Sequence, residues 1–131
     1  MTEKELEEIF RGKKQRVNKT TGKVKPGFVL TQFTDFQDWY NQETFDDGCH
    51  YCGTSNERSF EIYTLRPGAT RGGKRGRRLE LERKEPNQPY DNLDNLVWCC
   101  YWCNNAKSNF FSEEEFRPIA NAIGEALNNI Q

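Results

Sequence analysis

Apolar residues are scarce in this sequence, and no long apolar run is present. Hydrophobic residues make up 34% of the 131 positions and charged residues 30%, and the mean hydropathy is -0.98. The core of one domain of this size is therefore thin, and a structural metal would supply order that apolar burial cannot. The first ten residues alternate acidic, basic and apolar side chains, so no secretory or membrane-spanning segment is expected. We expect a cytoplasmic protein without a membrane partner.

Acidic residues are absent from two stretches, although the formal net charge is only -1. No Asp or Glu lies between Phe10 and Thr34, or between Arg66 and Arg78, and the second stretch is rich in glycine. Two basic stretches can form a positive face, and a polyphosphate is the natural ligand of such a face. The alternative is a solvated tail and a mobile turn. The candidate nucleic-acid-binding residues in the second stretch are Arg71, Lys74, Arg75, Arg77 and Arg78.

Histidine occurs once, at His50, and cysteine five times. Four of the cysteines form two Cys-x-x-Cys pairs, and each pair can chelate one ion from a tight turn. The odd count, with Cys99 as a spare thiol, favours a reducing compartment over a secreted disulfide framework. Four thiolates suit tetrahedral Zn²⁺, so the sequence predicts a structural zinc site. Its ligands are Cys49, Cys52, Cys100 and Cys103.

The chain is expected to divide into an arm and one folded domain. Residues 2–10 have the composition of a short acidic helix, and residues 11–27 show neither helical nor strand periodicity. We therefore predict a flexible basic arm over residues 1–27 and a single domain over residues 28–131. A capping-box pattern that starts at Thr34 predicts a short helix near the beginning of the domain.

The segment between the two cysteine pairs is expected to form a long hairpin. Residues 59–65 are rich in Phe, Ile and Tyr and predict a strand, residues 66–78 predict its turn, and residues 78–84 predict the partner strand. Apolar and acidic residues alternate in that second strand, so one of its faces is acidic. A loop over residues 86–94 then leads to a short strand over residues 96–99.

Two helices are expected after the second cysteine pair. One begins at Asn104, and the other begins after Ser112, where Ser112 and Glu115 form a capping box. The terminal helix has an apolar stripe at helical spacing. Its members are Phe116, Ile119, Ile123 and Leu127.

Four segments carry a family resemblance, namely Cys49–Gly53, Leu79–Pro86, Asp94–Val97 and Cys100–Lys107. In order, spacing and residue type they resemble HNH endonucleases with a four-cysteine zinc site, over residues 35–116. The resemblance implies an α+β fold, a small zinc-stapled ββα-metal domain (treble-clef-like) with flanking helices. It also implies an endonuclease that hydrolyses phosphodiester bonds of nucleic acid, with double-stranded DNA as the expected partner.

The same resemblance assigns roles to individual residues. It places the acidic metal ligand on Glu82, the loop asparagine on Asn95 and the helix-start asparagine on Asn104. The oxygens of Glu82 and Asn104 are hard ligands that suit a catalytic Mg²⁺ or Mn²⁺. Asn95 is expected to fix the loop through hydrogen bonds to the backbone. Lys107, one helical turn beyond Asn104, either contacts a phosphate or is an ordinary solvent lysine.

One position departs from the family pattern. Arg83 stands where the family has its general-base histidine, and a guanidinium can contact a phosphate but cannot accept a proton. His50 is expected to be a solvent-facing residue of the first cysteine pair. A replacement base could be Glu80, Glu85, Tyr90 or a metal-bound hydroxide. If none serves, the protein is a catalytically impaired, zinc-stabilised module that binds DNA or RNA, and the sequence leaves open whether it is a monomer or a homodimer.

Overall fold

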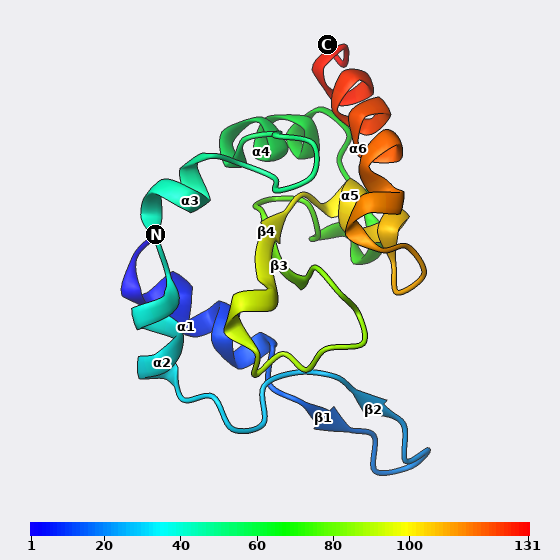
Figure 1. Ribbon diagram of the computed structural model, residues 1–131. Helices are drawn as coiled ribbons and strands as arrows, with labels where there is room; N and C mark the ends of the chain where they lie inside the picture. Colours follow the sequence, from blue (N-terminus) through cyan, green and yellow to red (C-terminus); the bar gives the residue numbers. More distant parts are fainter.

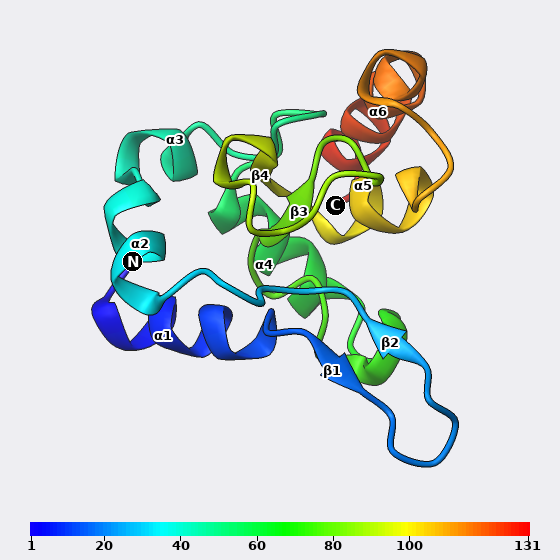
Figure 2. The ribbon, with the colours of Figure 1, turned by 60° about the horizontal axis from the view of Figure 1, so that its bottom comes forward.

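A central two-stranded sheet is surrounded by helices in the computed structural model, which describes residues 1–131 (Figures 1 and 2). No helix combines the length and the apolar character that crossing a bilayer requires. The elements in chain order are α1 (Glu3–Gly12), β1 (Arg16–Val17), β2 (Val24–Lys25), α2 (Phe33–Trp39), α3 (Gln42–Asp46), α4 (Asn56–Leu65), η1 (Arg71–Gly73), β3 (Glu80–Arg83), η2 (Leu93–Asn95), β4 (Leu96–Cys99), α5 (Tyr101–Lys107) and α6 (Glu113–Asn128).

Strands β3 and β4 pair antiparallel, with Glu80 opposite Cys99 and Arg83 opposite Leu96. Leu81 is buried in the core, and its neighbours in the strand are only partly buried. The acidic face predicted for this strand is therefore present, and it places Glu80 and Glu82 on the same side because side chains alternate along a strand. Helix α5 follows β4 directly, which gives the order strand, strand, helix.

The strand predicted over residues 59–65 is wrong, because this segment belongs to helix α4. Ser55 caps the helix by accepting a hydrogen bond from the backbone N–H of Arg58 at 3.0 Å. Ser59 and Ile62, three positions apart, are both buried, as on one face of a helix. The partner of β3 is therefore β4, and residues 66–78 connect α4 to β3 rather than turning a hairpin.

The N-terminal segment begins with a packed helix. Thr2 and Glu5 form a capping box at the start of α1, and the helix buries Leu6, Ile9 and Phe10 in the same core as the rest of the chain. After α1 the chain forms the β1–β2 ribbon, which projects from the body (Figure 2). The basic arm predicted over residues 1–27 thus starts with a helix that contributes to the core, and the boundary at residue 28 stays a prediction.

Two helices begin earlier than predicted. Helix α2 begins at Phe33 because Gln32 and Asp35 form the capping box there, in place of Thr34. Helix α5 begins at Tyr101 because the sulfur of Cys100 accepts a hydrogen bond from the N–H of Cys103 at 3.3 Å. Asn104 consequently lies one turn inside α5 rather than at its first position.

Helix α6 has the predicted capping box, in which Ser112 and Glu115 bond each other's backbone. Its buried face is Phe116, Ala120, Gly124 and Leu127, and the two isoleucines of the predicted stripe are only partly buried. Gly124 permits close packing: a Cβ at this position would lie 3.0 Å from the carbonyl oxygen of Cys52. Helix α6 therefore packs directly against the first cysteine pair.

Candidate active site and metal centre

The four predicted zinc ligands converge on one point. Their sulfur atoms all lie within 4.8 Å of one another, and the Sγ atoms of Cys52 and Cys100 are 3.7 Å apart. Tetrahedral coordination with Zn–S bonds of about 2.3 Å places sulfurs about 3.8 Å apart. The arrangement, called the cysteine cluster below, thus fits a metal ion such as Zn²⁺. It comprises Cys49, Cys52, Cys100 and Cys103.

Two local turns produce this convergence. The first pair lies between α3 and α4, where Gly53 N–H donates to the carbonyl of Cys49 at 2.8 Å. Gly53 has φ of 77°, a left-handed conformation that glycine adopts without steric cost. The second pair lies at the junction of β4 and α5. His50 N–H donates to the carbonyl of Trp98 at 2.8 Å and so ties the first turn to β4.

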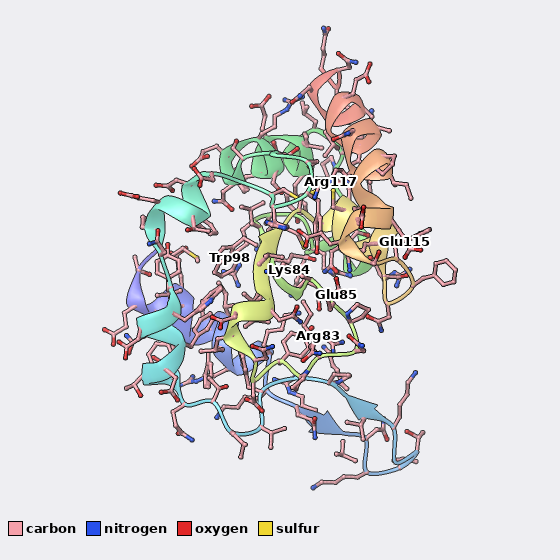
Figure 3. All side chains as sticks on the ribbon, viewed as in Figure 1. Arg83, Lys84, Glu85, Trp98, Glu115 and Arg117 are labelled. Carbon is pink, nitrogen blue, oxygen red and sulfur yellow. The ribbon has the colours of Figure 1, made fainter.

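A cavity of about 60 Å³ lies beside the cysteine cluster, between β3 and α5. Glu82 and Asn104, the two residues predicted to hold a catalytic cation, both line it. Figure 3 shows Arg83, a third wall residue, at the end of β3 that faces the ribbon. The full set of lining residues is Tyr51, Glu82, Arg83, Pro86, Cys99, Asn104, Lys107, Ser108 and Asn109.

The Glu82 carboxylate is held by three donors. It accepts hydrogen bonds from the Tyr90 hydroxyl, from the Arg83 N–H at 3.1 Å and from the Lys13 ammonium at 3.4 Å. Burial raises the pKa of Glu82, but the charge of Lys13 and the hydrogen bonds from Tyr90 and Arg83 lower it more. The pKa of Glu82 therefore lies below its usual value, and the side chain is an anion at neutral pH.

The side-chain oxygen of Asn104 is left free by its neighbours. Asn104 Nδ2 donates to Glu80 Oε1 at 2.9 Å, and Glu80 in turn accepts two hydrogen bonds from Arg75, at 2.6 and 3.1 Å. This chain fixes the orientation of the amide, because its NH₂ group must face Glu80. Asn104 Oδ1 accepts no hydrogen bond from the protein, so it can accept one from a ligand or coordinate a cation.

Two residues of the cavity wall each have a buried donor that makes no hydrogen bond, although Arg83 Nε lies 4.0 Å from the Glu82 carboxylate. Arg83 Nε and the Tyr51 hydroxyl are both inaccessible to solvent and make no hydrogen bond within the protein, and both residues line the cavity. A buried donor without a partner costs about 1–3 kcal/mol, so such groups are uncommon unless a ligand satisfies them. The guanidinium of Arg83 also packs on the Tyr90 ring, 4.6 Å from its centroid, and bonds the carbonyl of Gln88 at 3.0 Å.

Asn95 and Lys107 contact the backbone of the β3–β4 loop. Asn95 is 6% exposed, and its amide accepts from Glu85 N–H at 3.1 Å and donates to Glu85 O at 3.0 Å. The geometry is the one expected of a residue that fixes the loop. Lys107 is buried, not a solvent lysine, and its ammonium donates to the carbonyl of Lys84 at 2.8 Å. Burial lowers the pKa of Lys107.

The basic residues predicted to bind nucleic acid do not share one environment. Arg75 forms an ion pair with Glu80 and packs 4.7 Å from the centroid of the Tyr101 ring, so part of its charge is compensated. Arg71, Lys74, Arg77 and Arg78 lie in or beside the connection from η1 to β3, and none of them forms an ion pair with a carboxylate in the structure. Their role in nucleic-acid binding stays a prediction.

None of the three side chains predicted as replacement bases lies on the cavity wall, so of the four candidates only a metal-bound hydroxide would form there. Glu80 is neutralised by Arg75, and Glu85 is exposed to solvent. The hydroxyl of Tyr90 donates to Glu82, and burial and the nearby Glu82 charge raise the pKa of Tyr90. His50 is exposed as expected, and it pairs with Glu113 outside the cavity.

Two residues of the site were not predicted from the sequence. Lys13 contacts Glu82 although 69 positions separate them, and no local pattern marks such a pair. Tyr51 occupies a variable position inside the first cysteine pair, yet it lines the cavity. A tight turn that chelates a metal also fixes the direction of its intervening side chains, and this was the available signal for Tyr51.

The fold is similar to that of the rare-cutting HNH restriction endonuclease PacI, with a TM-score of 0.60 and 26% sequence identity. The match covers 76% of this chain and 66% of the PacI chain, so the chain spans slightly less than two thirds of that structure's length. No family model matches the sequence, and no curated protein matches it. The predicted resemblance and the α+β class are confirmed. The chain therefore has an HNH-nuclease fold around a cysteine cluster that is compatible with a zinc site.

Proposed function

We propose that the protein is a cation-dependent endonuclease that hydrolyses phosphodiester bonds in double-stranded DNA. The observation that carries the proposal is a small cavity whose wall holds a carboxylate, an amide oxygen that accepts no hydrogen bond, and two residues with a buried donor that makes none. A phosphodiester with its cation needs this combination, because the cation requires hard oxygen ligands and the phosphate requires donors. The likeness to a restriction endonuclease supports the same conclusion.

Glu82 and Asn104 are the residues that would hold the cation. Both belong to the β3–β4–α5 unit, one on β3 and the other on α5, and both face the same cavity. Mg²⁺ and Mn²⁺ are bound by few protein oxygens and keep positions open for water and phosphate. A divalent cation held there would activate water and neutralise the charge that develops on the phosphate. The cysteine cluster is assigned to Zn²⁺ with a structural role, because four thiolates close the coordination shell and leave no position for substrate.

Arg83 and Tyr51 are the residues that would bind the scissile phosphate. Arg83 keeps its charge at any working pH, and its unused Nε–H can donate to a phosphate oxygen. The Tyr51 hydroxyl offers a second donor on the same cavity. Binding a phosphate would remove the cost of leaving both donors buried without partners, and it would place the phosphorus beside Glu82 and Asn104.

The test is cleavage of supercoiled plasmid by the zinc-loaded protein, with Mg²⁺ or Mn²⁺ and without either ion. We expect nicking that requires the added cation and disappears in Glu82→Ala, with the zinc content unchanged. Glu85→Ala is the matched control, because Glu85 lies three positions away, is exposed and does not line the cavity. Loss of activity in both variants, or cleavage that persists in Glu82→Ala, would contradict the proposal.

The Lys13–Glu82 ion pair favours a second candidate function. An ammonium 3.4 Å from the proposed metal ligand already compensates its charge, and no histidine lines the cavity to act as a base. On this alternative the protein binds DNA or RNA and does not cleave it. Salt-sensitive binding without cleavage in any divalent cation is the expected result for such a module.

A further inference from the structure

The β1–β2 ribbon is fully exposed along its length. Every residue from Lys14 to Pro26 is exposed, and the ribbon points away from the helices that form the body (Figure 2). A two-stranded ribbon that packs against nothing contributes little to the stability of a domain. Stability of the fold therefore does not explain why the ribbon is present. The chemistry of its surface and its attachment to the body indicate a role in binding.

The base of the ribbon is held firmly. Phe28 N–H donates to the carbonyl of Lys13 at 2.7 Å, and Gln15 N–H donates to the carbonyl of Phe28 at 3.0 Å. Gly27 allows this close approach, since a Cβ there would lie 2.2 Å from the Lys13 oxygen. Phe28 is buried and stacks on Phe10 with a centroid distance of 5.1 Å. The ribbon thus has a fixed attachment.

This attachment places the base of the ribbon close to a residue of the proposed catalytic cavity. Lys13, the residue at which the chain leaves α1 for the ribbon, has its ammonium 3.4 Å from Glu82. A polymer bound along the ribbon would therefore pass close to the cavity. The ribbon is in position to contact the substrate away from the bond that is cut.

The surface chemistry of the ribbon matches DNA. No acidic residue occurs in it, and none of its basic side chains forms an ion pair with a carboxylate. Val17 and Val24 are paired across the two strands and are 56% and 48% exposed, so they form an apolar patch that nothing in the chain covers. Phosphates suit the charges, and thymine methyl groups suit the valines. The basic residues are Lys14, Arg16, Lys19, Lys23 and Lys25.

We propose that the β1–β2 ribbon lies in the major groove of duplex DNA and makes the protein prefer double-stranded substrate. Strands about 4.8 Å apart, with side chains on both sides, are too wide for a minor groove of about 6 Å and fit a major groove of about 12 Å. This inference rests on the proposed function in taking DNA as the substrate and the cavity as the place where it is cut. It identifies the element that contacts DNA and the groove in which that element lies.

The test compares two double variants that remove the same charge. Arg16→Gln/Lys25→Gln acts on a cross-strand pair of the ribbon. The control, Lys4→Gln/Arg117→Gln, removes two exposed cations, one in the first turn of α1 and the other on α6, where Figure 3 shows Arg117 away from the ribbon. Zinc-loaded full-length proteins, without added Mg²⁺ or Mn²⁺, are titrated into a 20-base-pair duplex and into its single strand. Fluorescence anisotropy gives the affinity between about 50 and 200 mM salt.

The ribbon variant is expected to lose about tenfold or more in duplex affinity, and its slope of log affinity against log salt should fall by about 2. The control variant should keep the wild-type slope, and single-strand binding should change little in either. Guanine N7 faces the major groove, so wild-type protein should protect it from dimethyl sulfate and the ribbon variant should not.

Equal losses in the two variants, absence of N7 protection, or a ribbon variant that changes only the oligomeric state in sedimentation would each overturn the proposal. The last result would mean that a second copy of the chain covers the valines. Plasmid nicking separates the two proposals. Cation-dependent nicking with no ribbon effect refutes only the ribbon's role, whereas ribbon-dependent duplex binding without nicking refutes only the hydrolysis.

Discussion

Replacing Lys13 by methionine should raise the affinity of the cavity for a divalent cation. The Lys13 ammonium lies 3.4 Å from a Glu82 carboxylate oxygen, and the two side chains are 25% and 23% exposed. A cation that binds Glu82 must overcome this contact and the repulsion of a fixed positive charge. Methionine keeps much of the length and the apolar character of the lysine stem and removes only the charge.

Coulomb's law sets the size of the effect. Two unit charges at this distance interact by about 1.2 kcal/mol in water and by about 5 kcal/mol at an effective dielectric constant of 20. Partial exposure of both side chains places the value in the lower part of this range, at about 2 kcal/mol. The dissociation constant for Mn²⁺ should therefore fall about 30-fold.

Isothermal titration of Mn²⁺ into zinc-loaded protein measures this change. Lys14→Met is the matched control, since it removes the same charge one residue away, where the lysine contacts the Phe10 ring and no carboxylate. Glu82→Gln should abolish the binding in the Lys13→Met background. Unchanged affinity in Lys13→Met, or an equal rise in Lys14→Met, would refute the reasoning, because the local ion pair would then not control the site.

Three further predictions test the cysteine cluster and the loops. Cys52→Ser should lose the bound zinc and its cooperative unfolding transition, because removing one thiolate surrenders much of a zinc-binding free energy of about 10–16 kcal/mol. Cys99→Ala, which changes a cysteine outside the cluster, should keep one zinc per chain, as mass spectrometry of the native protein measures. Asn95→Ala should lower the free energy of unfolding in urea by about 1–3 kcal/mol through two lost backbone contacts. Asn95→Asp should lose at least as much, because a buried carboxylate cannot donate to the Glu85 carbonyl oxygen. Burial raises the pKa of Asp91, but hydrogen bonds from the Thr31 hydroxyl and from three backbone N–H groups lower it below its usual value. The carboxylate therefore stabilises the fold above about pH 4 and loses this effect as the pH falls through its folded pKa, so the stability gap between Asp91→Asn and wild type should shrink in acid.

The cysteine cluster and the positions of strands β3 and β4 could be predicted because their signals are local, whereas the pairing of β3 with β4 was not, because residues 59–65 were predicted to be the partner strand. Two residues between cysteines fix a chelating turn, and period-two alternation identified the strand that carries Glu82. Helix α4 was mistaken for a strand because short apolar runs fit both structures. The cap at Ser55 decides for a helix, and the two buried positions Ser59 and Ile62 fit helical spacing.

The remaining features depend on packing between distant segments. Lys13 reaches Glu82 only because α1 packs on α2 and Phe28 returns the ribbon to Lys13. Nothing in residues 11–27 indicates that contact, since the stretch has the composition of a solvated arm. The burial of Lys107 also depends on packing between distant segments, because its ammonium bonds the carbonyl of Lys84 in the loop after β3.

The cavity and the cysteine cluster share their backbone, which couples the two sites. Tyr51 lies inside the first cysteine pair, Cys99 precedes the second pair, and Asn104 directly follows it. Without an ion, no ligand holds the four sulfurs together, so the two cysteine turns become mobile. Residues in and beside these turns line the cavity, and they would move with the turns. The weaker cation site should consequently disappear together with the structural ion. In a titration with a zinc chelator, Mn²⁺ binding should fall in parallel with zinc release, whereas Mn²⁺ binding that outlasts the zinc would show that the cavity is held by β3 and β4 alone.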